Sequence, residues 1–203
     1  MSVLVLYSIS KFDRMVRMRY MLAHMLEGEA KEYHTELADR IAESFNLTPV
    51  GRHCDPRISL KAPFETNDVS DVTAAVSAFA MTEEATPFEL TGFGSFEGRV
   101  VYKDIEAPEE TVALVRRLQD QLREISWLQF SSHETPITLH TTISFPRTPE
   151  QAKEIMSYLE KEPPVKFQCM LDSISLLHKR ERRWEVARTF KLTPQPVSVV
   201  SAL

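Results

Sequence analysis

Cysteine and glycine are scarce in this sequence, which has two cysteines and five glycines among 203 residues. Two thiols, Cys54 and Cys169, are too few for the disulfide scaffolds on which small secreted domains depend. No glycine-rich phosphate loop lies between a strand and a helix, because Gly92, Gly94 and Gly98 fall in an expected hairpin. A disulfide-built scaffold and a P-loop nucleotide site are therefore both excluded.

Long hydrophobic runs and an excess of positive charge are also missing. The first apolar run, residues 3–7, is too short to span a membrane, and no basic segment precedes it as in a secretory signal. The formal net charge of −5 argues against unspecific coating of nucleic acids but leaves room for a local basic cleft. We therefore expect a cytoplasmic protein that has no membrane partner.

The order of the expected elements predicts an α+β fold. Short β-branched runs, amphipathic stripes and helix caps indicate alternating strands and helices. In chain order they are a buried strand at 3–9, a helix at 27–45, a strand from Arg57, a helix capped by Asp68, strands at 87–96 and 98–106, a helix opened by Pro108, a strand at His140, a helix from 149 to 159 behind the capping box 148–151, and strands at 165–177 and 182–192. The tail over 193–203 contains two prolines, and we expect it to be poorly ordered.

Two of the expected strands combine one apolar face with a row of polar and basic groups. Side chains alternate between the faces of a strand. Arg57, Ser59 and Lys61 therefore share one face of the first strand, and His140 and Thr142 share one face of the second. Each polar face carries a basic or titratable group beside a hydroxyl. Two such strands side by side would make a phosphate site.

The residues around these strands resemble the 2H phosphoesterase superfamily, in particular its RNA 2'-5' ligase-like and cyclic phosphodiesterase members. Residues 136–143, Pro-Ile-Thr-Leu-His-Thr-Thr-Ile, fit the second His-x-Thr/Ser motif of that family. Residues 56–64, Pro-Arg-Ile-Ser-Leu-Lys-Ala-Pro-Phe, fit the first, except that Arg57 stands where the family has histidine. The resemblance implies a single bilobal domain over 1–192. Its two pseudo-symmetric lobes, each an antiparallel sheet with packed helices, would enclose a central cleft.

The resemblance also implies metal-independent chemistry, without a cofactor, on 2',3'-cyclic or 2'-5' phosphodiesters of nucleotides or RNA ends, in the direction of hydrolysis or of ligation. His140 would transfer protons, because imidazole titrates near neutral pH. Ser59 and Thr142 would donate hydrogen bonds to phosphate oxygens, and Lys61 would add positive charge. Arg57 stays protonated, so it cannot act as a general base, but it is a strong bidentate phosphate ligand. The alternative is a catalytically degenerate module that binds nucleotides, RNA or another protein.

Four further residues are candidates for the rim of the cleft: His53, Phe93, His178 and Arg180. A bend at residues 55–56 could return His53 to the cleft mouth, and His178 and Arg180 sit at the last expected hairpin. Phe93 could stack on a base or pack in the core. The His-Cys-Asp triplet at 53–55 is not expected to bind a metal, because zinc normally takes at least three protein ligands and no second cluster lies at ligand spacing.

Residues 11–26 interleave basic and apolar side chains. As a helix this segment would have an apolar stripe with a basic flank. It could form an RNA-contacting arm at the cleft mouth, a partner-binding helix, or a helix packed on the domain with its charges in solvent. Residue spacing leaves these alternatives open, and the sequence does not fix the oligomeric state.

Overall fold

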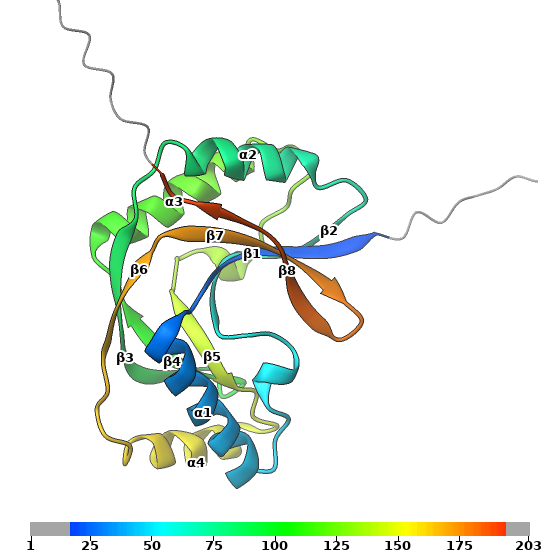
Figure 1. Cartoon of the computed structure of the whole chain (residues 1–203). Coiled ribbons are helices and arrows are strands. Elements are labelled where there is room, and N and C mark those ends of the chain that lie inside the picture. The colour runs from blue at the N-terminus through cyan, green and yellow to red at the C-terminus, as the bar shows by residue number, and fades with distance from the viewer. Residues whose placement is uncertain (1–16, 194–203) are drawn as a thin grey trace, which may run out of the picture.

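Two four-stranded antiparallel sheets form the framework of the protein (Figure 1). The computed structural model describes residues 17–193. The first sheet has the strand order β2-β1-β7-β8 and the second has the order β5-β4-β3-β6. The strands are β1 (Met18–Met25), β2 (Arg57–Thr66), β3 (Thr86–Phe96), β4 (Val100–Glu106), β5 (His140–Ser144), β6 (Phe167–Leu171), β7 (Ser173–Arg180) and β8 (Arg183–Lys191). The α-helices are α1 (Gly28–Ser44), α2 (Ser70–Ala80), α3 (Glu109–Arg123) and α4 (Pro149–Leu159), with two 3-10 turns, η1 (Val50–Arg52) and η2 (Ser132–Glu134). The expected α+β class is confirmed.

The pairing of the strands places the two motif strands at sheet edges. The last hairpin, β7–β8, returns to pair with β1, where Tyr20 lies opposite His178. The middle hairpin, β3–β4, pairs with β5, where Asp104 lies opposite His140. As a result β2 and β5 each occupy the edge of a different sheet, and these two edges contact each other.

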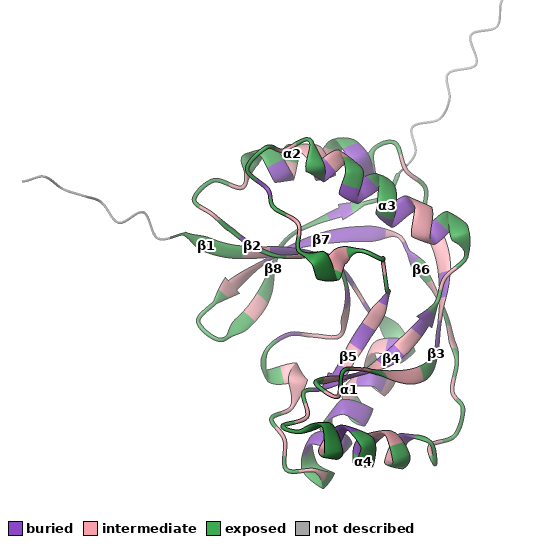
Figure 2. Ribbon diagram, turned by 180° about the vertical axis from the view of Figure 1, so that it is seen from behind, coloured by how far each residue is buried: buried purple, intermediate pink, exposed green. Residues whose placement is uncertain are grey.

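The helices cover the sheets in two pairs, as Figure 2 shows from behind. α2 packs against β7 and β8, and α3 packs beside it against β2 and β3. The expected inner stripe of α3 is confirmed, since Leu114, Leu118 and Leu122 are all buried. α1 and α4 cover the other side of the second sheet, where Ile41 and Ile155 pack in a second core cluster. No helix in the described range is long and apolar enough to cross a membrane.

Local signals fix where the helices begin. The Thr148 hydroxyl accepts a hydrogen bond from the backbone N–H of Gln151 at 3.2 Å, and Pro149 occupies the first turn, as the capping sequence predicts. The Asp68 carboxylate accepts a hydrogen bond from Ser70 N–H at 2.8 Å, although the N-cap residue itself is Val69. These side chains satisfy backbone donors that helix geometry leaves unpaired.

Two expectations about secondary structure are wrong. The part of segment 11–26 that the structure describes forms strand β1 rather than a helix, and four consecutive residues, 21–24, are buried in it. A central strand buries both faces, so it lacks the alternation that would have marked it. The stretch 165–177 is two strands separated by Asp172, with β6 in the second sheet and β7 in the first. The expected strand at 3–9 and the tail from 194 onward lie outside the described residues.

Candidate functional site

A pocket of about 160 Å³ lies between the edge strands β2 and β5. Arg57 and Ser59 from β2 and His140 and Thr142 from β5 line it. The rest of the wall comes from α1, from the segment that precedes β2, from a further residue of β5 and from two aromatic residues: His34, Thr35, Ala38, Asp39, Val50, Gly51, His53, Cys54, Asp55, Pro56, Thr141, Phe145 and Trp184. Four residues of the predicted phosphate site and the rim candidate His53 therefore meet around one cavity.

The ring of His140 is held by three contacts. Its Nδ1–H donates to the carbonyl oxygen of Thr138 at 2.9 Å, because a carbonyl can only accept. The ring centroids of Phe96 and Tyr102 lie 4.8 Å and 5.2 Å from that of His140. With the proton on Nδ1, the neutral imidazole keeps its lone pair on Nε2. This tautomer suits a general base or a hydrogen-bond acceptor at the pocket.

Burial lowers the pKa of His140 below its usual value. The hydrogen bond to Thr138 opposes this shift, and the positive charge of Arg57 adds to it. The imidazole is therefore neutral at pH 7, which is the state a base requires.

Arg57 brings an unneutralised positive charge to the pocket. The residue is half-buried, and within residues 17–193 it forms no ion pair. Its Nε atom is buried and has no hydrogen-bond partner among the described residues. A buried hydrogen-bond donor without a partner costs free energy. An oxyanion in the pocket would supply the acceptor that the guanidinium of Arg57 lacks.

Sequence reasoning missed His34, which lies on α1 and lines the pocket. The residue is 1% exposed, its Nε2 lies 3.1 Å from the Thr141 hydroxyl, and its Nδ1 is buried with no partner in the described chain. Burial lowers the pKa of His34 to about 4, and the nearby charges of Lys103 and Arg57 act in the same direction. A signal existed, because His34 lies four residues after Ala30 and three before Leu37, on the buried face of the helix.

The low pKa of His34 predicts a loss of stability in mild acid. The folded pKa of about 4 lies below the unfolded value of 6.5, so the unfolded chain binds more protons between these pH values. This contribution to stability is complete above pH 6.5 and falls as the pH drops toward 4. Between pH 7 and pH 5 we expect the free energy of unfolding to fall by about 2 kcal/mol more in the wild type than in His34→Gln. Urea unfolding at both pH values measures it, and equal pH dependence in the two proteins would contradict the assignment.

Gly94 makes room for the aromatic residue that supports His140. Gly94 lies opposite Tyr102 in the β3–β4 pair, and a Cβ at this position would clash with Cζ of the Tyr102 ring. The Tyr102 ring cannot move aside freely, because it stacks on Phe96 with centroids 4.3 Å apart and also contacts His140. Gly94 therefore belongs to the support of the site although it does not line the pocket.

Gly94→Ala is expected to destabilise the fold by about 1–3 kcal/mol, because the added methyl group overpacks against Tyr102. The displaced ring should also disturb the position of His140. Gly92→Ala is the matched control, since a Cβ at Gly92 would meet no heavy atom within 4 Å. Urea unfolding of both variants measures the difference, and equal midpoints would show that Tyr102 yields without cost.

Lys61 does not line the pocket, contrary to its predicted role as a phosphate ligand. Its side chain is 1% exposed, and its ammonium lies 3.1 Å from the carboxylate of Glu134. The expected alternation fails because the β1–β2 register shifts on both sides of the Leu22–Lys61 pair, so that Leu60 and Lys61 are both buried. The Lys61–Glu134 pair fixes the loop that leads toward β5 against β2.

Of the four rim candidates, the structure places His53 at the pocket. His53 Nδ1–H donates to the carbonyl oxygen of Arg182 at 3.2 Å. Phe93 instead packs under the ammonium of Lys103, 4.5 Å from its ring centroid. His178 and Arg180 lie near one carboxylate oxygen of Glu185, at 3.6 Å and 3.9 Å, and do not line the pocket.

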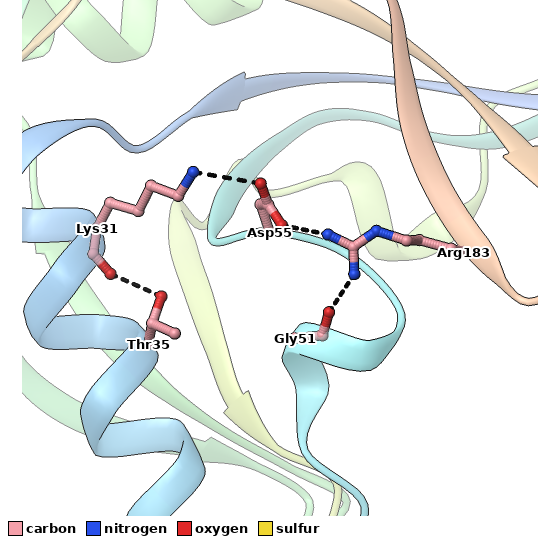
Figure 3. Close-up of polar contacts among 5 residues, drawn as sticks. All are labelled: Lys31, Thr35, Gly51, Asp55 and Arg183. Atoms are coloured by element: carbon pink, nitrogen blue, oxygen red, sulfur yellow. Dashed lines mark hydrogen bonds and ion pairs between the residues drawn. The ribbon is translucent and has the colours of Figure 1, made fainter.

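Ion pairs fix the loop that forms one wall of the pocket (Figure 3). The carboxylate of Asp55 binds Lys31 of α1 at 3.2 Å and also binds Arg183 of β8. Arg183 donates a second hydrogen bond to the carbonyl oxygen of Gly51. The backbone N–H of Trp184 donates to the carbonyl oxygen of His53 at 2.7 Å. The wall is thus tied to α1 on one side and to the β7–β8 hairpin on the other.

The described residues contain no group of three or more His, Cys, Asp or Glu side chains that could hold a metal ion. The two motif strands bring to the pocket the neutral imidazole of His140, the guanidinium of Arg57 and hydroxyl-bearing residues that include Ser59 and Thr142. These groups can bind an oxyanion and move a single proton.

Solved structures share this fold. TT0787 of Thermus thermophilus superposes with a TM-score of 0.64 and 18% identity, over 88% of this chain and 100% of that chain. E. coli LigT complexed with 3'-AMP superposes with a TM-score of 0.55 and 18% identity, over 87% of this chain and 99% of that chain. E. coli LigT complexed with NADP+ gives a TM-score of 0.58 and 17% identity, over 87% and 98% of the two chains. At these identities the likeness shows the common fold, and no curated protein matches the sequence.

The sequence itself matches the model of one protein family. The match runs over residues 29–183 and is to the 2'-5' RNA ligase superfamily. These residues include both motif strands and nearly all of the pocket wall, from His34 on α1 to the start of β8. The family match and the fold agree with the resemblance to 2H phosphoesterases that the motif strands carry. The chain therefore belongs to the 2'-5' RNA ligase superfamily.

Proposed function

We propose that this protein binds a phosphodiester of a nucleotide or RNA end between β2 and β5 and opens a 2',3'-cyclic phosphate there without a metal ion. One observation carries the proposal: Arg57, a cation without a partner in the described chain, lines the same pocket as the neutral His140. The hydroxyls of Ser59 and Thr142 line it as well. A guanidinium and two hydroxyls are suited to the non-bridging oxygens of a phosphate.

In the proposed reaction water attacks phosphorus, and Nε2 of His140 takes the proton that the water loses. The bond from phosphorus to one ribose oxygen breaks, and that oxygen gains a proton. Water and the departing oxygen lie on opposite sides of phosphorus, so one imidazole cannot reach both. His140 therefore takes the proton from the water, and solvent protonates the departing oxygen. Arg57 neutralises the charge that gathers on the phosphate oxygens. A site with a single motif histidine should be about 10²–10⁴-fold slower than a two-histidine site. In ligation the 5'-hydroxyl of a second RNA end would attack phosphorus in place of water, His140 would take its proton, and the same ribose oxygen would depart and be protonated.

Two aromatic side chains at the pocket support a nucleotide as the ligand. Phe145 follows β5 and is 55% exposed although it lines the pocket. Trp184 of β8 lines the pocket from the other sheet. Trp184 is partly buried, whereas Phe145 is exposed. Accessible aromatic rings beside a phosphate site are suited to stack on a base. E. coli LigT, which has the same fold, has been solved in complexes with 3'-AMP and with ATP.

The proposal is tested by incubating the purified full chain with each of the four 2',3'-cyclic nucleotides in the presence of a chelator. We expect slow, chelator-insensitive production of nucleoside monophosphates. Binding of 3'-AMP is measured in parallel by calorimetry. Failure to bind any of these nucleotides would contradict the proposal as a whole.

Arg57 favours a second candidate function, a module that binds nucleotides or RNA without turning them over. A guanidinium in place of the first imidazole strengthens oxyanion binding but removes one proton-transfer group. Tight binding of 3'-AMP without any turnover of the cyclic nucleotides would favour this alternative. For either function we propose a cytoplasmic location, which the free thiols of Cys54 and Cys169 support.

A further inference from the structure

The β7–β8 hairpin carries an excess of positive charge that the proposed reaction does not use. Six basic and two acidic side chains lie between Lys179 and Lys191, in a chain with a net charge of −5. Arg180, Arg182 and Arg183 at the hairpin turn are exposed. Such a local reversal of the overall charge indicates a surface for a polyanion.

The hairpin turn is joined to the loop that forms the pocket wall. Trp184 N–H donates to the carbonyl oxygen of His53, and His53 Nδ1–H donates to the carbonyl oxygen of Arg182 at 3.2 Å. Arg183 binds the carbonyl oxygen of Gly51 in the same loop. Residues 51–53 therefore lie directly beside residues 182–184. This places the exposed side chain of Arg52 next to the basic turn, and we call Arg52, Lys179, Arg182 and Arg183 together the basic rim.

The basic rim is connected to the pocket through a groove. A wider groove of about 550 Å³, lined by Lys31, Arg52 and Arg183, shares Thr35, Gly51, Asp55 and other wall residues with the pocket. Asp55 is the single carboxylate that Lys31 and Arg183 share, so this cluster keeps an excess of positive charge (Figure 3). A ligand whose terminal phosphate occupied the pocket could thus continue along positively charged surface.

An aromatic residue stands at the centre of this surface. Trp184 lines the pocket, and the side-chain charges of Lys179 and Arg19 lie 5.9 Å and 6.0 Å from its ring centroid. Trp184 is partly buried, so part of its ring remains accessible. Cations beside an accessible aromatic ring are typical of surfaces that bind single-stranded nucleic acid, where phosphates meet the cations and bases stack on the ring. An acidic peptide would match the charge but not the continuity with a phosphate pocket.

We propose that the basic rim binds the nucleotides next to the terminal phosphodiester, so that the substrate is a single-stranded RNA end several nucleotides long rather than a mononucleotide. This inference rests on the proposed function, because it takes the pocket as the site of the terminal phosphate. Arg183 also holds the pocket wall, so the test uses the other three members of the rim.

The test compares equilibrium binding of an eight-nucleotide RNA ending in a 3'-phosphate with that of 3'-AMP, for the wild type and for Arg52→Gln/Lys179→Gln/Arg182→Gln. Arg116→Gln/Lys153→Gln/Lys161→Gln removes the same charge from exposed positions on and beside α3 and α4 and serves as the matched control. We expect the wild type to bind the RNA at least about tenfold more tightly than 3'-AMP at about 50 mM salt. The rim variant should bind 3'-AMP as the wild type does.

Salt dependence gives the sharper readout. Removing three phosphate contacts should reduce the slope of log affinity against log salt concentration by about 2. The affinity ratio of wild type to rim variant should therefore shrink about twentyfold between 50 and 200 mM salt. Circular dichroism confirms that each variant is folded.

The outcomes separate the two proposals. Equal affinity for RNA and 3'-AMP, or equal weakening in the rim and control variants, would overturn the inference and leave the proposed function standing. If the protein binds RNA through the basic rim but does not bind 3'-AMP, the result would support RNA binding at the rim and contradict phosphate binding in the pocket. Binding of neither ligand would overturn both.

Discussion

His140→Ala is expected to lower the turnover of a 2',3'-cyclic nucleotide by about 10²–10⁴-fold, the usual contribution of a general acid or base. The affinity for 3'-AMP should change little, because Arg57, Ser59 and Thr142 still line the pocket. The reason is the tautomer: the Thr138 carbonyl holds the proton on Nδ1, so Nε2 is the atom available to accept a proton. Steady-state kinetics with a chelator present, together with calorimetric binding of 3'-AMP, measures both quantities.

The matched control for this variant is His133→Ala. His133 lies in η2, is exposed and does not line the pocket, so its removal should leave turnover unchanged. A fall in rate in both variants would point to a general effect of losing a histidine. Turnover that persists in His140→Ala would assign the proton transfer to another group, and His34 would be the next histidine to test, since it lines the same pocket.

Arg57→Ala is expected to weaken the binding of 3'-AMP by about 10–100-fold, because it removes hydrogen bonds to a charged group worth about 1.5–3 kcal/mol. A second effect follows from the charge. Arg57 contributes to the lowered pKa of His140, so its removal should raise that pKa. A neutral imidazole acts as the base, so activity falls as the pH drops through this pKa, and the acid limb of the rate profile should move to higher pH.

Arg57→Lys separates the two effects of Arg57→Ala. Lysine keeps the positive charge near His140 but lacks the planar fork that binds two phosphate oxygens. We expect the acid limb of Arg57→Lys to stay near that of the wild type while its affinity for 3'-AMP lies between those of the wild type and Arg57→Ala. Calorimetry and rate profiles from pH 5 to pH 8 measure both. Unchanged affinity in Arg57→Ala would show that the phosphate does not contact Arg57.

The elements that the sequence predicted well are those whose signals are local. The caps at Thr148 and Pro149 and the leucine stripe of α3 depend on neighbours within a turn or two, so they can be read without knowing the fold. The polar faces of the two motif strands are equally local. They were enough to predict that Arg57 and His140 belong to one site, and the structure places both residues around one pocket.

The errors arose where distant parts of the chain decide the outcome. β1 is buried on both faces between β2 and β7, so its residues show no alternation, and their spacing imitated a helix. The stretch around Asp172 read as one strand because nothing local shows that its two halves join different sheets. Lys61 does not lie on the polar face of β2, because the register between β1 and β2 shifts at this residue. The shift appears only in the pairing of the two strands.

The amino-acid sequence by itself determined the α+β class and the two motif strands that carry Arg57 and His140. Only the tertiary structure brought His34 from α1, and Trp184 with the basic rim from the last hairpin, to the pocket between the motif strands. The physical reason is that a side chain's face within a helix or strand follows from backbone geometry alone. Which faces meet follows from burial and pairing between segments far apart in the chain.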